Sequence, residues 1–187
     1  IPSGEERRSP AIVDGRGLKR DYPWGRTLFG VRAWVHAVEE VTIAGGEGAF
    51  PFREGQSGIH THMTNTKNTP VEALELAYPL RVEEYRLIPR SGGAGRYRGG
   101  DGIRRSIRFL ADRGTLTIIS DRRRRGPAGL AGGRDGRRGR NRLIRGGRPV
   151  ALPGKTTREV RRGDVVVVET PGGGGWGRPA VRKGQAP

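Results

Sequence analysis

The sequence predicts a strand-dominated α+β domain with short strands, glycine-rich loops and one or two short helices. Glycine and proline are abundant, with 33 and 13 of 187 residues, while hydrophobic residues make up only 33% and aromatic residues 6%. Such a chain has many tight turns and a thin core. Four consecutive valines at 165–168 are typical of a buried strand.

The chain divides into three parts. Residues 1–26 are polar and contain three prolines, so we expect a surface arm or linker. Residues 27–179 form the predicted domain, and residues 180–187 a frayed tail. At the start of the domain, apolar residues of one parity predict a strand over 31–37, and Val41–Ile43 predicts another.

A glycine-rich connector over 45–58 follows, in which Phe50 and Phe52 are expected to fill a gap in the core. Thr69-Pro70-Val71-Glu72 then has the pattern of a capping box, with Thr69 as the N-cap and Pro70 as the first helical residue. We therefore expect a short helix that ends before Pro79.

Strands are predicted on both sides of a second glycine-rich segment. Leu80–Leu87 alternates imperfectly and predicts one strand. Ile103–Leu110 and Thr115–Ser120 predict two more, paired as a hairpin around residues 111–114. Near the end of the domain, residues 171–176 contain four glycines and a tryptophan, which favours a packed turn.

The segment Ser91–Gly102 contains six glycines, with Arg96 and Arg98 between them. Small residues let backbone N–H groups approach a phosphate, and guanidinium groups pair with its oxygens, so Arg96 and Arg98 are candidate phosphate ligands. The third glycine of a dinucleotide fingerprint is missing, and a strand rather than a helix follows. A turn-rich loop between strands is the alternative.

The chain is strongly basic, with 36 Lys and Arg against 19 Asp and Glu, a net charge of +17. The block Asp121–Arg148 alone holds eleven arginines and two aspartates. Arg-Gly segments of this kind occur in RNA-binding proteins, so an RNA- or polyanion-binding module is one hypothesis. Aromatic residues for base stacking are absent from the block, which favours a solvated or partner-facing surface instead.

Cysteine is absent, which excludes disulfides and thiolate metal sites and suits a cytoplasmic protein. No run approaches the roughly 18 apolar residues that would span a bilayer, so we expect no membrane partner.

The most unusual stretch is Gly55–Glu75, which holds two of the three histidines, the only methionine and four threonines. If Ile59–Met63 is extended, His60 and His62 lie on one face, where both could bind a metal ion or an anionic substrate group. The backbone N–H groups at the start of the following helix also favour anions. The alternative is that these polar residues only hold a turn together.

This stretch resembles the hydantoinase B/oxoprolinase family. The run Ser57-Gly-Ile-His-Thr-His-Met-Thr-Asn-Thr-Lys-Asn-Thr-Pro-Val-Glu-Ala-Leu-Glu75 is similar to a signature in the C-terminal part of that family. Further motifs agree in the same order: Thr42-Ile-Ala-Gly-Gly-Glu-Gly48, Tyr78-Pro-Leu-Arg-Val82, Ser91–Gly102, Gly129-Leu-Ala-Gly-Gly133 and Thr170-Pro-Gly-Gly-Gly-Gly-Trp-Gly177. The resemblance covers about residues 38 to 179.

The resemblance implies a C-terminal segment of a subunit that hydrolyses cyclic amides such as hydantoin or 5-oxoproline with ATP; a ketone carboxylase is the alternative within the family. It implies ATP and a divalent metal, both outside this chain, and two protein partners: a hydantoinase A-type subunit and the N-terminal part of the B-type polypeptide. We therefore expect no turnover by the isolated chain.

Within the signature, His60 and His62 are the expected catalytic residues. Asn65, Thr66, Asn68 and Glu72 are expected to orient a small cyclic amide by hydrogen bonds. No metal ligands are expected in this chain, because nothing in it matches the histidine and aspartate motifs of the family's N-terminal part.

Overall fold

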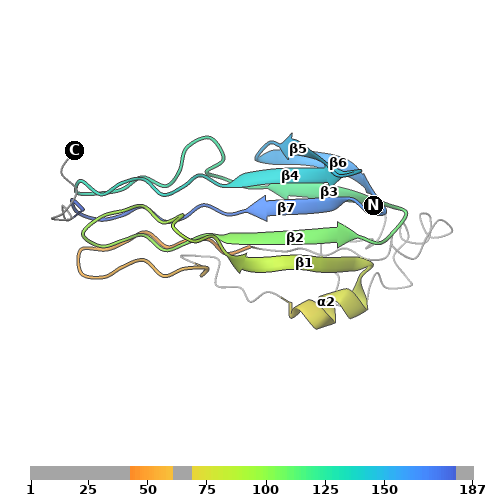
Figure 1. The fold of residues 1–187 in the computed structure, drawn as a ribbon, viewed down its shortest axis with the longest axis horizontal. Helices are drawn as coiled ribbons and strands as arrows, with labels where there is room; N and C mark the ends of the chain where they lie inside the picture. The colour runs from red at the N-terminus through yellow and green to blue at the C-terminus, as the bar shows by residue number, and fades with distance from the viewer. Residues whose placement is uncertain (1–42, 61–68, 180–187) are drawn as a thin grey trace, which may run out of the picture.

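The computed structural model describes residues 43–60 and 69–179, which contain seven strands and one helix (Figure 1). The strand-dominated α+β class is therefore confirmed. The arm at 1–26, the tail at 180–187, the strand predicted over 31–37 and most of Val41–Ile43 lie outside the described residues. The elements are α2 (Val71–Ala77), β1 (Leu80–Leu87), β2 (Ile103–Phe109), β3 (Arg113–Ile119), β4 (Arg140–Arg145), β5 (Arg148–Leu152), β6 (Lys155–Arg161) and β7 (Val165–Glu169).

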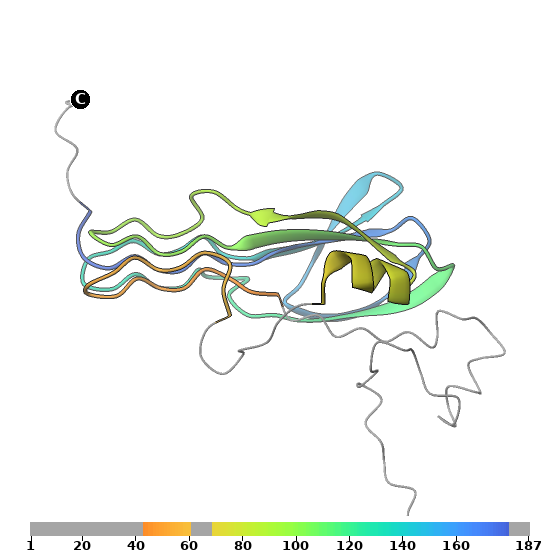
Figure 2. The same cartoon turned by 90° about the horizontal axis from the view of Figure 1, so that it is seen from below.

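The strands form two antiparallel sheets that enclose a small core. The larger sheet has the order β1-β2-β7-β4-β5, and the smaller one pairs β3 with β6. Ile118 and Val160 of the smaller sheet pack with Leu143, Leu152 and Val166 of the larger one. The core therefore lies between the sheets, and Figure 2 shows β3 in a separate layer from β2.

One predicted pairing is wrong. The strands expected at Ile103–Leu110 and Thr115–Ser120 are present as β2 and β3, but β2 pairs with β1 and β7, and β3 pairs with β6. The connection after Phe109 carries the chain from one layer to the other. A hairpin would have placed Ile118 in the plane of the larger sheet, whereas here it covers the apolar face of that sheet.

The helix α2 begins one residue later than the capping box predicts. Pro70 is the N-cap residue, with φ −52° and ψ 144°, and no side-chain hydrogen bond caps the helix. The helix ends at Ala77, before Pro79, as expected. Leu74 is fully buried, and the Glu75 carboxylate accepts a hydrogen bond from the backbone N–H of Val82 on β1 (2.7 Å), so the helix is fastened to the edge of the sheet.

The glycine-rich segments form a bundle that continues the larger sheet at one end (Figure 1). We call it the glycine bundle; its segments are 45–49, 53–58, 91–95, 97–102, 126–130, 133–139 and 170–177. Segment 170–177 follows β7 and lies at the centre, in direct backbone contact with five of the other six. The prediction of a packed turn at 171–176 is therefore correct for the packing but wrong for the turn. These residues form a central extended segment.

Contacts of the central segment repeat every third residue. The backbone N–H groups of Gly172 and Gly175 donate to the carbonyls of Arg137 and Arg134, both on segment 133–139. Gly173 and Trp176 donate to Gly100 and Tyr97, both on segment 97–102. A period of three is characteristic of polyproline II and collagen-like chains, in which hydrogen bonds run between chains rather than within one.

Glycine is required here by space. A Cβ on Gly172, Gly173 or Gly174 would lie 2.1, 1.8 or 2.0 Å from the carbonyl oxygen of Ser91, Glu47 or Ala128. None of these three glycines has φ in the left-handed region, so the missing side chain, and not a special backbone conformation, lets the backbones approach.

The two phenylalanines of the first connector do not fill a gap in the core. Phe50 and Phe52 are 43% and 87% exposed. Instead, the Arg53 guanidinium lies 4.4 Å from the Phe50 ring centroid. The backbone of this connector, rather than its aromatic side chains, makes the packing contacts.

Replacement of Gly173 by alanine should lower the free energy of unfolding by about 3 kcal/mol, because the new methyl group would force backbone segments apart. Gly48→Ala is the matched control: its Cβ would meet only the Gly174 oxygen at 3.9 Å. We expect a change within about 0.5 kcal/mol there. Urea denaturation followed by circular dichroism measures both, and equal losses would contradict a close-packed bundle.

Candidate functional site

The predicted catalytic pair is partly described. His60 comes after segment 53–58 and Ile59. Ile59 forms an antiparallel bridge with Gly45. The His60 Nε2 atom is buried and has no hydrogen-bond partner among the described residues. His62 lies outside them, so the shared face of His60 and His62 stays a prediction.

The predicted substrate-orienting residues are mostly outside the described residues. This holds for Asn65, Thr66 and Asn68. Glu72 is described and lies in the first turn of α2, where it is exposed. The two ends of the histidine stretch are thus held by different parts of the fold, one by the glycine bundle and the other by the edge strand β1.

Arg96 and Arg98, the predicted phosphate ligands, have different surroundings. Arg98 Nη2 pairs with Asp101 Oδ1 at 2.8 Å, while the exposed Arg96 has its guanidinium 5.7 Å from the Tyr97 ring centroid. The nearby backbone N–H groups of Gly93, Gly99 and Gly100 donate to other carbonyls of the bundle. If this loop binds phosphate, it therefore does so through its side chains. Phosphate binding by Arg96 and Arg98 stays a prediction.

A metal centre cannot be assembled from the described residues alone. Residues 43–60 and 69–179 contain no group of three or more His, Asp and Glu side chains that could hold a metal ion. In the same ranges no helix is long and apolar enough to cross a bilayer.

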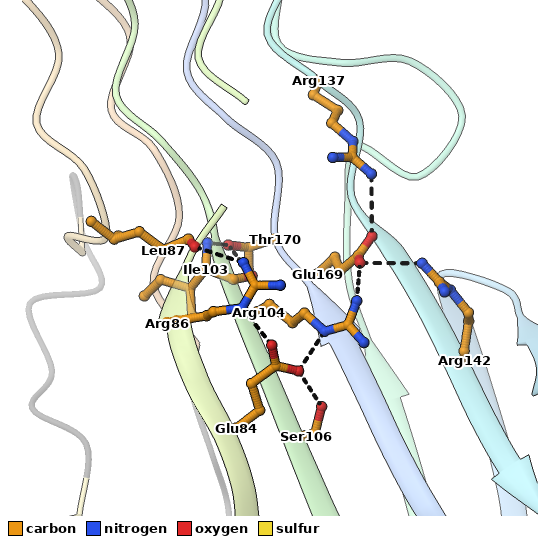
Figure 3. A network of polar contacts seen from close by, with 10 residues as sticks. All are labelled: Glu84, Arg86, Leu87, Ile103, Arg104, Ser106, Arg137, Arg142, Glu169 and Thr170. Carbon is orange, nitrogen blue, oxygen red and sulfur yellow. Dashed lines mark hydrogen bonds and ion pairs between the residues drawn. The ribbon is translucent and has the colours of Figure 1, made fainter. Parts of the chain in front are cut away.

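A network of polar side chains lies where the larger sheet meets the glycine bundle (Figure 3). Its centre is Glu169, the last residue of β7, whose side chain is 6% exposed. Glu169 Oε1 accepts hydrogen bonds from Arg104 Nη1 at 2.9 Å and from Arg142 Nη2 at 3.1 Å. Arg137 Nη2 lies 3.6 Å from Glu169 Oε2. We call these four residues the Glu169 cluster.

A second carboxylate, Glu84 on β1, extends the network. Its Oε2 accepts hydrogen bonds from Arg104 Nε at 2.6 Å and from Ser106 Oγ at 3.3 Å, and its Oε1 pairs with Arg86. Burial raises the pKa of the Glu84 carboxyl, but the hydrogen bonds from Arg86 and Arg104 outweigh burial, so the pKa lies below its ordinary value. Glu84 therefore stays ionised at neutral pH.

Sheet register explains why these charges meet. Arg104 lies opposite Glu169 in the β2–β7 pairing, and paired residues of antiparallel strands share a face. That face is opposite the core, because the core residues Val166 and Leu143 have the other parity. Our sequence reasoning missed the cluster. The available signal was Glu169 itself, a single carboxylate placed directly after a buried valine run.

Known proteins share this fold. The ATP-dependent caprolactamase from Pseudomonas jessenii has a similar structure, with a TM-score of 0.60 and 27% identity over 73% of this chain and 25% of that one. The fold and motifs therefore define a domain found in larger enzymes. The chain belongs to the hydantoinase B/oxoprolinase family, whose sequence profile matches residues 23–179. The resemblance based on the histidine signature is thereby confirmed.

Two named relatives show the breadth of the family. The chain is 44% identical to 5-oxoprolinase 1 from Arabidopsis thaliana over 137 residues, which covers 73% of this chain and 11% of that protein. It is 36% identical over 144 residues to a protein from Pseudomonas sp. (strain NS671) that is named as the B-type subunit of a D-/L-hydantoinase, covering 73% of this chain and 24% of the relative. The chain thus matches only a minor part of each relative.

Replacement of Glu169 by glutamine should lower the free energy of unfolding by about 2 kcal/mol, because three guanidinium groups would lose their buried counter-charge. Glu83→Gln is the control. Glu83 pairs with Arg108 at the surface, with side chains 33% and 40% exposed, and such pairs contribute about 0.5 kcal/mol. Thermal and urea unfolding at neutral pH measure the difference. Similar losses in the two variants would show that the cluster contributes no more to stability than a surface ion pair.

Proposed function

We propose that this chain is the C-terminal segment of a hydantoinase B/oxoprolinase-like subunit of a cytoplasmic, ATP-dependent enzyme that opens cyclic amides such as hydantoin or 5-oxoproline. Its partners would be a hydantoinase A-type subunit and the N-terminal part of the B-type polypeptide. The observation that carries the proposal is the family match over residues 23–179. The names of the relatives and of the ATP-dependent caprolactamase support the reaction class.

In this proposal the described residues provide the frame for the histidine stretch. The bundle positions His60 through the Ile59–Gly45 bridge, and α2 positions Glu72. His60 and His62 would contact the reacting amide, while Asn65, Thr66, Asn68 and Glu72 would hold the ring by hydrogen bonds. A buried Nε2 atom with no partner among the described residues suits a ligand-binding role for His60.

ATP and the divalent metal are expected on the other parts of the enzyme. There, ATP would phosphorylate an amide oxygen and so make it a good leaving group. The contribution of this chain would be to bind and orient the ring.

The structure gives no support to a disordered Arg-Gly module. Segments 126–130 and 133–139 of the basic block are built into the glycine bundle, and Gly136 donates to the Pro127 carbonyl (2.9 Å). Arg123 of the same block is half-buried and donates to the Asn141 side chain. Burial lowers the pKa of Arg123 from its ordinary value. The block is therefore partly structural, and nucleic-acid binding is left as an outcome of the test below.

The first test is co-expression of the chain with the N-terminal part of a B-type subunit and an A-type subunit. We expect a stable complex that hydrolyses ATP in step with ring opening of hydantoin or 5-oxoproline, measured as ADP and carboxylate release. A ketone with bicarbonate tests the carboxylase branch in the same assay. Failure to form the complex, or recovery of bound RNA in place of the partners, would refute the proposal.

The second test uses histidine variants of the active complex. His60→Ala and His62→Ala should each lower kcat at least tenfold, because each removes a group in contact with the substrate. His36→Ala is the control, since His36 is the remaining histidine and lies outside the signature. Unchanged kinetics of the two signature variants, with normal assembly, would assign these histidines to a structural role.

A further inference from the structure

The Glu169 cluster holds more positive charge than its carboxylate can compensate. Arg104, Arg137 and Arg142 converge on one carboxylate from β2, from segment 133–139 and from β4 (Figure 3). Three guanidinium groups and one carboxylate leave a surplus of two positive charges. Glu84 also pairs with Arg104, but Arg86 balances the charge of Glu84, so the surplus is unchanged.

We propose that the Glu169 cluster binds a phosphate group through the arginines Arg104, Arg137 and Arg142, with Glu169 as the buried carboxylate that holds them in place. The inference rests on the proposed function only for the source of the phosphate, either a phosphorylated substrate or free phosphate released from ATP. The binding itself is argued from the arginine geometry.

Unused hydrogen-bond donors support the proposal. A guanidinium carries about five N–H donors, and the contacts to Glu169 and Glu84 engage only a few of them. Arg104 and Arg142 are half-buried, yet none of their nitrogens is among the buried polar atoms of the described residues that have no hydrogen-bond partner, and Arg137 is exposed. Their remaining N–H groups therefore reach solvent.

The Glu169 carboxylate and the three guanidinium groups are buried to different extents. The Glu169 side chain is 6% exposed, whereas those of Arg104, Arg142 and Arg137 are 26%, 34% and 43% exposed. The carboxylate thus lies beneath the guanidinium groups and leaves their outer edges open. A ligand would meet arginines that are already oriented, which lowers the entropy lost on binding.

Charge and shape favour phosphate over a carboxylate ligand. A phosphate monoester carries about −1.5 to −2 charges at pH 7, which matches the surplus of the cluster, and it offers several acceptor oxygens to planar guanidinium forks. A simple ion pair joins one arginine to one carboxylate and leaves no surplus charge. The chain contains such a pair in Arg145 and Asp164, 2.6 Å apart, and the Glu169 cluster departs from that pattern.

The test is a titration of the 187-residue chain at low ionic strength with inorganic phosphate and, separately, with phenyl phosphate, followed by calorimetry. We expect saturable binding of at least one of these probes. Tighter binding of phenyl phosphate would identify a site for a phosphorylated substrate, and equal binding a site for free phosphate. Absence of saturable binding with either probe would overturn the proposal.

Variants locate the site. Arg104→Gln and Arg142→Gln should weaken phosphate binding at least tenfold, while Arg108→Gln should change it less than twofold. Arg108 is the matched control, because it lies on the same face of β2 as Arg104 but pairs with Glu83. If Arg104→Gln or Arg142→Gln fails to fold, Arg137→Gln replaces it, since the Arg137 side chain makes only the 3.6 Å contact with Glu169 among the described residues. Equal weakening in the control, or displacement of phosphate by a short single-stranded RNA with no dependence on these arginines, would show that diffuse basic charge binds the anion.

Discussion

Direct backbone-to-backbone packing around segment 170–177 is the constraint on which the rest of the structure depends. Its N–H and C=O groups bond to segments 45–49, 91–95, 97–102, 126–130 and 133–139, which are distant from one another in the chain. A helix or a simple ladder would satisfy these groups with one or two neighbours. Here the centre is complete only when all five surrounding segments are in place, so the bundle should form late and cooperatively.

The same constraint determines the sheet. Segment 170–177 continues β7, segment 97–102 leads into β2, and segment 133–139 leads into β4. These three segments of the bundle are therefore neighbours in the same order as the strands β2, β7 and β4. At their junction Thr170 donates its backbone N–H to the Ile103 carbonyl (2.8 Å), and its Oγ1 accepts from the Ile103 N–H (2.7 Å). Glu169 lies next to this junction, which explains why arginines from three elements can reach one carboxylate.

The functional consequence is a rigid frame on both sides of the histidine stretch. One side is the bundle, whose close spacing leaves little room for adjustment. The other is α2, held against β1 by the buried Leu74 and by the carboxylate of Glu75. The Glu169 cluster belongs to the same frame through Arg104 of β2. A site built on rigid elements keeps its geometry better than one on a free loop, which suits the substrate-orienting role proposed for this stretch.

The sequence by itself determined the strand-dominated class, the positions of β1, β2, β3 and β7, the short helix before Pro79 and, through its motifs, the family. These features depend on local periodicity, helix- and strand-breaking residues and the order of the motifs, all of which are visible in the sequence itself. The strand pairing, the central position of residues 170–177 and the Glu169 cluster were decided only by the tertiary structure. A glycine-rich segment has no side chains to indicate its neighbours, and the meeting of Arg104, Arg137 and Arg142 at Glu169 depends on sheet register between elements far apart in sequence.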